Sequence, residues 1–297
     1  MTRGTSRRAA LALVASLSTL VAASPAYATV HHPTGNYAPY ADCPLSDNAV
    51  VLCLLAQTTS GEFTVGTRTV PINKTITLQG GLVETPETEE TGAYQLVAAE
   101  NGETLSKTAL YVPGGLFNSK PPESWPKEAK EHYEEMINKG LTGVTETTEL
   151  AKPASDVSVN PSNLVNQEGV ALELPVKVKL GNFLLGNNCY VGSEANPIVL
   201  RLTTGTTEPP EPNKPIKGKV GEIIAKEEFN IVELLGGSLV DNAFAAPAAK
   251  GCGAPFEGLV DSLVDSLLGV PSAAGHNTAI LNGNLGEATS EGVLASE

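Results

Sequence analysis

The four cysteines are the residues whose spacing limits their chemistry most clearly. They stand at Cys43, Cys53, Cys189 and Cys252, and four cysteines allow three disulfide pairings. A structural zinc site usually takes its ligands in close pairs such as CxxC, and a catalytic redox pair has the same spacing, which this chain lacks. We therefore expect structural disulfides, with Cys43–Cys53 as the local pair and Cys189–Cys252 as the long-range pair.

Histidine and serine could support hydrolysis only near His276. Ser272, Asp261 and Asp265 lie close to it in the sequence, and a Ser-His-Asp site needs all three residue types. The chain lacks the GxSxG motif that presents a serine nucleophile in many hydrolases. We therefore expect no catalytic residue and no enzymatic activity, and we keep a secreted hydrolase that uses His276 as an alternative.

A metal site is suggested only at one place, near the start of the chain. Cleavage after Ala28 would expose Thr29-Val30-His31, and an amine, two amide nitrogens and an imidazole at the third position can hold Cu(II) or Ni(II) in a square plane. This site is a hypothesis that depends on that cleavage. Elsewhere we expect no metal, because close-paired zinc ligands and an EF-type calcium loop are both missing, and no cofactor, because neither a Walker motif nor GxGxxG occurs.

The first 28 residues have the features of a secretory signal peptide. Three arginines precede an apolar run from Ala9 to Ala23, and Ala26-Tyr27-Ala28 fits a cleavage site. The pair Arg7-Arg8 leaves both general secretion and twin-arginine export open. No later stretch reaches eighteen apolar residues, so we expect no transmembrane span in the mature chain and a secreted, extracellular or cell-envelope location.

The charge of the chain excludes polyanionic partners. Removing residues 1–28 takes Lys and Arg from 19 to 16 against 33 Asp and Glu, so the formal net charge moves from −14 to −17. A field of this sign repels nucleic acid and anionic membrane surfaces. The partner is otherwise unknown, and the sequence leaves a contact with the cell wall or with a small apolar ligand open.

Residue alternation predicts a mainly β protein, an antiparallel sandwich or flattened barrel with one or two covering α-helices. The pair Asn101-Gly102 favours a tight turn, which predicts a hairpin over 93–112. We expect residues 29–297 to form a single domain, with a sub-boundary near the proline-rich segment 206–218 as the alternative. Strand patterns occur at 50–56, 62–81, 141–151, 170–181, 196–205, 219–247 and 277–286.

Two segments have the apolar spacing of amphipathic helices. In 121–140, Ser124 is a candidate cap, and the apolar stripe suggests a helix that covers a sheet edge or face. In 256–269, seven apolar residues follow the i, i+3, i+4 pattern, and Gly269 is placed to end the helix. This second stripe could also hold an apolar molecule against the sheet.

Several stretches of the chain together resemble a family of proteins. They include "DCPLSDNAVVLC", "TVPINKTITLQGG", "CYVGSEANPI", "SLVDNAFAAP" and "PSAAGHNTAILNG". These stretches are similar to a family of secreted actinobacterial proteins with paired cysteines, for which no activity is assigned. The resemblance implies export and disulfides, and it carries over no catalytic or binding residue.

The sequence therefore favours an exported, non-enzymatic protein. We expect it to bind a partner or to form part of the cell surface. A carrier of an apolar small molecule is the first alternative, and the hydrolase is the second.

Overall fold

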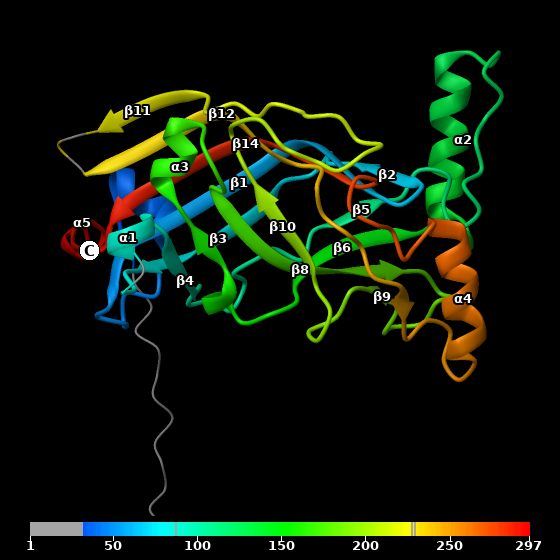
Figure 1. Cartoon of the computed structure of the whole chain (residues 1–297), viewed down its shortest axis with the longest axis horizontal. Coiled ribbons are helices and arrows are strands. Elements are labelled where there is room, and N and C mark those ends of the chain that lie inside the picture. The colour runs from blue at the N-terminus through cyan, green and yellow to red at the C-terminus, as the bar shows by residue number, and fades with distance from the viewer. Residues whose placement is uncertain (1–31, 87, 227, 229) are drawn as a thin grey trace, which may run out of the picture.

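The computed structural model describes residues 32–86, 88–226, 228 and 230–297 (Figure 1). The predicted signal peptide, 1–28, and the candidate copper or nickel site at Thr29-Val30-His31 lie outside the described residues.

A single antiparallel sheet of fourteen strands dominates the fold, and it confirms the prediction of a mainly β protein. Its main path runs β11-β12-β14-β1-β3-β4-β7-β8-β6-β5, and β2, β9, β10 and β13 branch from it. The strands are β1 (Val50–Val65), β2 (Arg68–Pro71), β3 (Ile76–Val83), β4 (Tyr94–Ala98), β5 (Ala109–Tyr111), β6 (Thr145–Leu150), β7 (Ser158–Val159), β8 (Leu172–Gly181), β9 (Tyr190–Val191), β10 (Ile198–Leu202), β11 (Glu222–Lys226), β12 (Ile231–Asp241), β13 (Ala249–Lys250) and β14 (Thr278–Thr289).

The sheet curls so that two of its parts face each other. In Figure 1, β8 and β10 cross in front of β1 and β3, and side chains from both groups of strands form the main core between them. The sheet is not closed into a barrel. One isolated bridge, between Thr203 after β10 and Val240 in β12, joins the two parts, with mutual backbone hydrogen bonds of 3.0 and 2.9 Å.

The inner face of each strand follows from alternation. In β8, the sequence LELPVKVKLG places Leu174, Val176, Val178 and Leu180 inside, while the intervening lysines reach the surface. Because the side-chain period is two, this pattern fixes the register of the strand against its neighbours.

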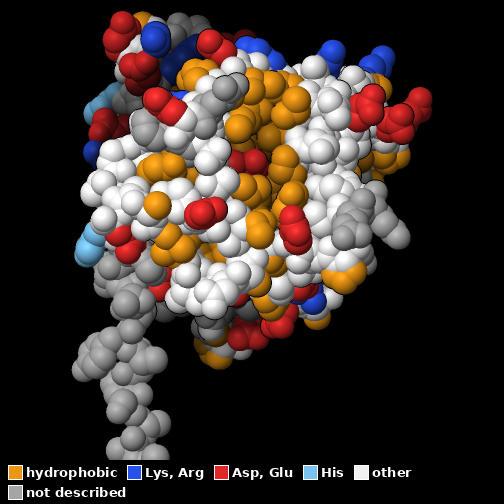
Figure 2. Space-filling model, turned by 90° about the vertical axis from the view of Figure 1, so that its left-hand side faces the viewer, with side chains coloured by type: hydrophobic (Ala, Val, Ile, Leu, Met, Phe, Trp, Pro, Cys, Tyr) orange, Lys and Arg blue, Asp and Glu red, His pale blue; other side chains and the backbone are white. Residues whose placement is uncertain are grey.

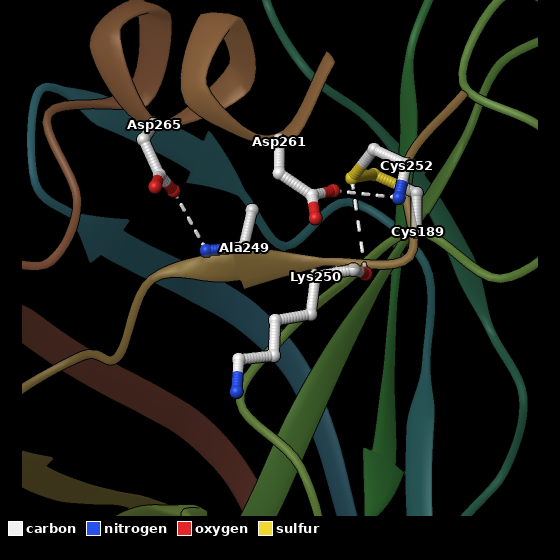
Figure 3. Close-up of a disulfide and its surroundings, with 6 residues drawn as sticks. All are labelled: Cys189, Ala249, Lys250, Cys252, Asp261 and Asp265. Atoms are coloured by element: carbon white, nitrogen blue, oxygen red, sulfur yellow. Dashed lines mark hydrogen bonds between the residues drawn. A yellow bond between two sulfur atoms is a disulfide. The ribbon is translucent and has the colours of Figure 1, made fainter. Parts of the chain in front are cut away.

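Both predicted disulfides are present: one lies in a smaller core cluster near the N-terminal segment, and the other is part of the main core. Cys43–Cys53 ties the N-terminal segment to β1, with a Cα–Cα distance of 5.5 Å. Cys189–Cys252 joins the ends of β9 and β13 across a sequence separation of 63. Figure 3 shows two aspartates of one helix beside this second bridge: Asp261 accepts from the Cys252 N–H and Asp265 from the Ala249 N–H, each at 2.7 Å.

The predicted hairpin over 93–112 is wrong. A turn does form at Ala99–Gly102, where Gly102 has φ +77°, but the two arms do not pair with each other. β4 pairs with β3 and β7, and Leu105 beyond the turn bridges Leu78, again in β3. Both arms of the predicted hairpin therefore pair with the same edge of β3, one after the other. Between them, the hydroxyl of the buried Thr104 accepts a hydrogen bond from the Ala99 N–H at 2.9 Å.

The described helices lie at the ends and edges of the sheet. They are α1 (Thr88–Thr91), α2 (Lys127–Lys139), α3 (Pro161–Asn166), α4 (Glu257–Leu268) and α5 (Ser290–Ala295), with short 3₁₀ turns at Gly35–Tyr40 and Ala154–Asp156. In the described part of the chain, none is long and apolar enough to cross a membrane.

The helix predicted in 121–140 exists as α2, but the expectation that it covers the sheet is wrong. None of its residues is buried, and Figure 1 shows it standing beyond the end of the sheet, next to α4. Trp125 packs edge-on against Tyr133, with ring centroids 5.9 Å apart, so part of the apolar stripe is covered by the segment itself. The start also differs, because Pro126 occupies the cap position and Ser124 makes no cap hydrogen bond.

The helix predicted in 256–269 corresponds to α4, which ends where expected. Gly269 has φ +70°, and its N–H donates to the Asp265 carbonyl. A Cβ at this position would lie 2.8 Å from the Thr67 side chain. Glycine is therefore needed both for the left-handed backbone conformation and for the close packing against Thr67.

The proline-rich segment 206–218 contains no strand, and hydrogen bonds hold it against the sheet. Thr206 bridges Lys217, and the Asn213 amide donates to the carbonyls of Asn242 and Asn277, both at 2.9 Å.

Candidate functional site

A row of apolar cavities runs through the interior between the facing parts of the sheet. We name four of them by their surroundings: the α3 cavity, of about 50 Å³; the central cavity, of about 70 Å³; the Arg68 cavity, of about 30 Å³; and the α4 cavity, of about 20 Å³. Neighbouring cavities share lining residues. The α3 and central cavities share Ala56, Thr58, Leu239 and Leu281. The central and Arg68 cavities share Glu146, and the Arg68 and α4 cavities share Val112, Leu180 and Leu268.

The central cavity is lined by hydrophobic side chains from both parts of the sheet. Phe63 and Leu78 come from β1 and β3, and Leu174 and Leu200 come from β8 and β10. A water molecule needs about 10–15 Å³ of such space, so this cavity has room for about five groups of that size.

Glu146 is the one ionisable residue that lines the central cavity, and it also lines the Arg68 cavity. It lies in β6 directly between Leu110 of β5 and Leu180 of β8, so its side chain occupies a position that suits leucine. The residue is 6% exposed, and none of the hydrogen bonds or ion pairs of the described residues involves its carboxyl group. Burial raises the pKa of Glu146 to about 8, because an apolar surrounding disfavours the charged form.

Arg68 lines the next cavity and is buried with an incomplete set of partners. Its Nε donates to the Leu267 carbonyl at 3.1 Å, and one terminal nitrogen donates to the Leu116 carbonyl at 3.2 Å. The other terminal nitrogen is buried without a hydrogen-bond partner, and burial lowers the pKa of the guanidinium. Among the described residues, no salt bridge joins Arg68 to Glu146, although both border the same cavity.

The α3 cavity lies at the opposite end of the row and is the most open of the four. Leu164 of α3 faces Leu234 of β12 and Leu285 of β14 across it. Figure 2 views the end of the molecule that carries α1, α3 and α5, and it shows hydrophobic side chains gathered in a hollowed band. This end therefore combines an apolar surface with the most open cavity of the row.

A second acid, Glu287, lies on the inner face of β14, two residues beyond Leu285. It is paired in register with the buried Leu54 of β1. Its Oε1 is buried without a hydrogen-bond partner, and burial raises the pKa of Glu287 to about 7. The inner face thus carries an acid near the α3 cavity and another at the far side of the central cavity.

The far end of the molecule, around α2 and α4, exposes large hydrophobic side chains, and we call it the apolar end. Phe183 is 87% exposed, Leu259 is 76% exposed and Phe256 is 70% exposed. The full set is Phe117, Trp125, Met136, Leu141, Phe183, Leu184, Phe256, Leu259 and Leu263. Large exposed hydrophobic side chains that gather at one end of a protein often mark a contact site.

The residues suggested for hydrolysis are used elsewhere. His276 is exposed, and both candidate aspartates, Asp261 and Asp265, accept backbone N–H groups around the Cys189–Cys252 bridge (Figure 3). No hydrogen bond between His276 and Ser272 occurs among those of the described residues. In the same part of the chain, no group of three or more His, Cys, Asp or Glu side chains could hold a metal ion.

Arg68, Glu146 and Glu287 were not singled out by the sequence analysis. One signal was available for Glu146: in "VTETTEL" the inner positions of the strand are Val144, Glu146, Thr148 and Leu150, so an acid falls on an otherwise inward face. Arg68 carries a similar signal, since it alternates with the inward Val70, but its partners, the carbonyls of residues 116 and 267, could not be found from the sequence.

Comparisons with protein families, with curated proteins and with solved structures found no match to this chain.

Proposed function

We propose that this is an exported, non-enzymatic binding protein that carries an elongated apolar molecule between the two facing parts of its sheet. The observation that supports the proposal is the row of neighbouring apolar cavities, which share lining residues and lie one after another from the end near α3 to the space beneath α4. Ligand sites are typically apolar spaces with a few polar groups that fix orientation. In this row of cavities, Glu146 and Arg68 are the polar groups that could orient a ligand.

Export agrees with the two disulfides, because such bonds persist in oxidising compartments. The predicted signal peptide points the same way. The proposed ligand is thin, because the four cavities of the row are small and the largest of these four holds about five water-sized groups. A hydrolase that uses His276 stays an untested prediction.

Filling the boundary between the α3 and central cavities should block binding. Leu281 lines both cavities, and we expect Leu281→Trp to weaken the binding of dodecan-1-ol about tenfold or more, measured by isothermal titration calorimetry. The control is Ile280→Trp, on the next residue of β14, whose side chain points to the opposite face of the sheet. Equal affinity in both variants would place the ligand elsewhere.

A thermal unfolding curve of each variant accompanies this measurement. Overpacking a core costs roughly 1–3 kcal/mol, so Leu281→Trp should remain folded at 25 °C. No binding of the alcohol to the unmodified protein, with its disulfides intact, would refute the proposed function itself.

Attachment to the cell envelope is a second candidate, and the apolar end favours it. We expect the double substitution Leu259→Glu and Leu263→Glu to move the protein from the cell-wall fraction to the medium. Both side chains are exposed, so the free energy of unfolding should change by less than about 0.5 kcal/mol. The matched control is Glu131→Gln and Glu134→Gln on α2. A protein found only in the medium before substitution would rule out this candidate.

A further inference from the structure

We propose that the carried molecule ends in a carboxylate, which binds in the Arg68 cavity between the free guanidinium nitrogen of Arg68 and the carboxyl group of Glu146. This inference rests on the proposed function and identifies the class of its ligand: a long-chain aliphatic acid, with its tail in the central cavity and continuing into the α3 cavity.

The first argument is the incomplete bonding of Arg68. Arg68 is 7% exposed, and two of its guanidinium nitrogens donate to the carbonyls of Leu267 and Leu116. The remaining nitrogen is buried with no partner, and no acid neutralises the charge among the ion pairs of the described residues. A buried charge without a counter-ion is costly, and a ligand carboxylate would supply both the missing charge and the missing acceptor.

The second argument is the choice of residue at this place. After residue 28 the chain has only two arginines, and the other, Arg201, forms an exposed salt bridge with Glu173. All other basic residues of that region are lysines, which are compact point charges. The planar guanidinium can hold two protein carbonyls and still present a further N–H to an acceptor, which is what the Arg68 cavity requires.

The third argument is the position of Glu146. It borders both cavities, so a molecule whose tail fills the central cavity must pass this residue to reach Arg68. In its protonated form, the carboxyl group of Glu146 is neutral, so it donates a hydrogen bond to a ligand carboxylate without repelling it. The apolar surroundings keep it protonated at neutral pH, because burial holds its pKa well above the ordinary value.

The size of the Arg68 cavity agrees with a small head group. Its volume of about 30 Å³ holds two or three water-sized groups, which suits a carboxylate and excludes a phosphocholine or a sugar. Its other lining residues are Val65, Val70, Val112, Val178, Leu180, Val191 and Leu268, so Arg68 and Glu146 are its only polar walls.

The test compares dodecanoic acid with dodecan-1-ol, which have the same chain length, by calorimetry on the full exported chain at pH 7. We expect the acid to bind about tenfold or more tightly than the alcohol. Arg68→Gln should weaken the binding of the acid about tenfold or more and so remove this preference. The control, Arg201→Gln, should keep the preference.

A pH series on the unmodified protein tests the same point without a variant, in case Arg68→Gln does not fold. As pH rises through about 8, Glu146 loses its proton and repels the ligand carboxylate, so the affinity for the acid should fall while that for the alcohol stays level. Arg68 and Glu146 are the ionisable groups among the residues that line these two cavities.

Equal affinities for acid and alcohol in the unmodified protein, or a preference that survives Arg68→Gln, would overturn this inference and leave the proposed function standing. If neither compound binds, the proposed function and the inference both fail.

Discussion

Replacing Glu146 with glutamine should make the protein increasingly more stable as pH rises from about 4.5 to about 8, and leave its stability unchanged in more acidic solution. In the unfolded chain this carboxyl group has its ordinary pKa near 4.5, and in the folded protein burial raises that pKa to about 8. Between these values the folded state binds one proton more than the unfolded state, so the free energy of unfolding falls as pH rises. Each pH unit costs about 1.4 kcal/mol, and the full window corresponds to roughly 5 kcal/mol.

Glutamine has nearly the same shape and cannot ionise. We expect the Glu146→Gln variant and the unmodified protein to have equal stability near pH 4.5 and to diverge up to pH 8, in urea unfolding followed by circular dichroism. Glu287 shifts in the same direction and is present in both proteins, so its effect cancels in the difference. If the stability of both proteins changes with pH in the same way, Glu146 is solvated and does not line the cavity as a buried polar group.

A leucine at the same position provides a second comparison. Leu110 and Leu180 flank Glu146 in register, so Glu146→Leu completes an apolar row and should stabilise the protein at every pH in this range. It should also abolish the pH dependence of acid binding described above, since no proton remains to be lost.

Removing the Cys189–Cys252 bridge should cause the largest loss of stability among the conservative changes we describe. The bond closes a sequence separation of 63, and the chain-entropy relation gives about 4 kcal/mol for a loop of that length. Serine at both positions is therefore expected to lower the free energy of unfolding by that amount, measured in urea at pH 5 without reductant.

The Cys43–Cys53 bridge is the natural comparison. It closes a separation of 10, and the same relation gives about 3 kcal/mol. Loss of the longer bridge should in addition free the ends of β9 and β13 and the start of α4, because Asp261 binds the Cys252 N–H. Amide hydrogen exchange should then be fast across β13 and α4 but not across β1 and β14. Unchanged protection of β13 would contradict this assignment.

The sequence was most informative where a local rule decides the outcome. Spacing excluded metal and redox roles for the cysteines and favoured the pairing that the structure has. Alternation located the main strands, because the period of two is set by burial on one face. Gly269 ended α4 as predicted, since its left-handed conformation suits glycine.

Predictions failed where a distant partner decides the outcome. The turn at Asn101-Gly102 forms, but the hairpin does not, because the free edge of β3 competes for both arms. Amphipathicity predicted α2 correctly and could not show that its stripe stays at the surface. The candidate site was missed for the same reason, since Arg68 and Glu146 meet at one cavity only after residues 68 and 146 are brought together by the curled sheet.

The most direct test of the carrier proposal is native mass spectrometry of the protein secreted by cells, compared with its denatured, unreduced mass. Our account predicts an additional mass in the native spectrum, equal to an aliphatic acid, that organic extraction removes and that is absent from the Leu281→Trp variant. A bare native mass that stays bare after incubation with saturating dodecanoic acid and dodecan-1-ol would contradict it.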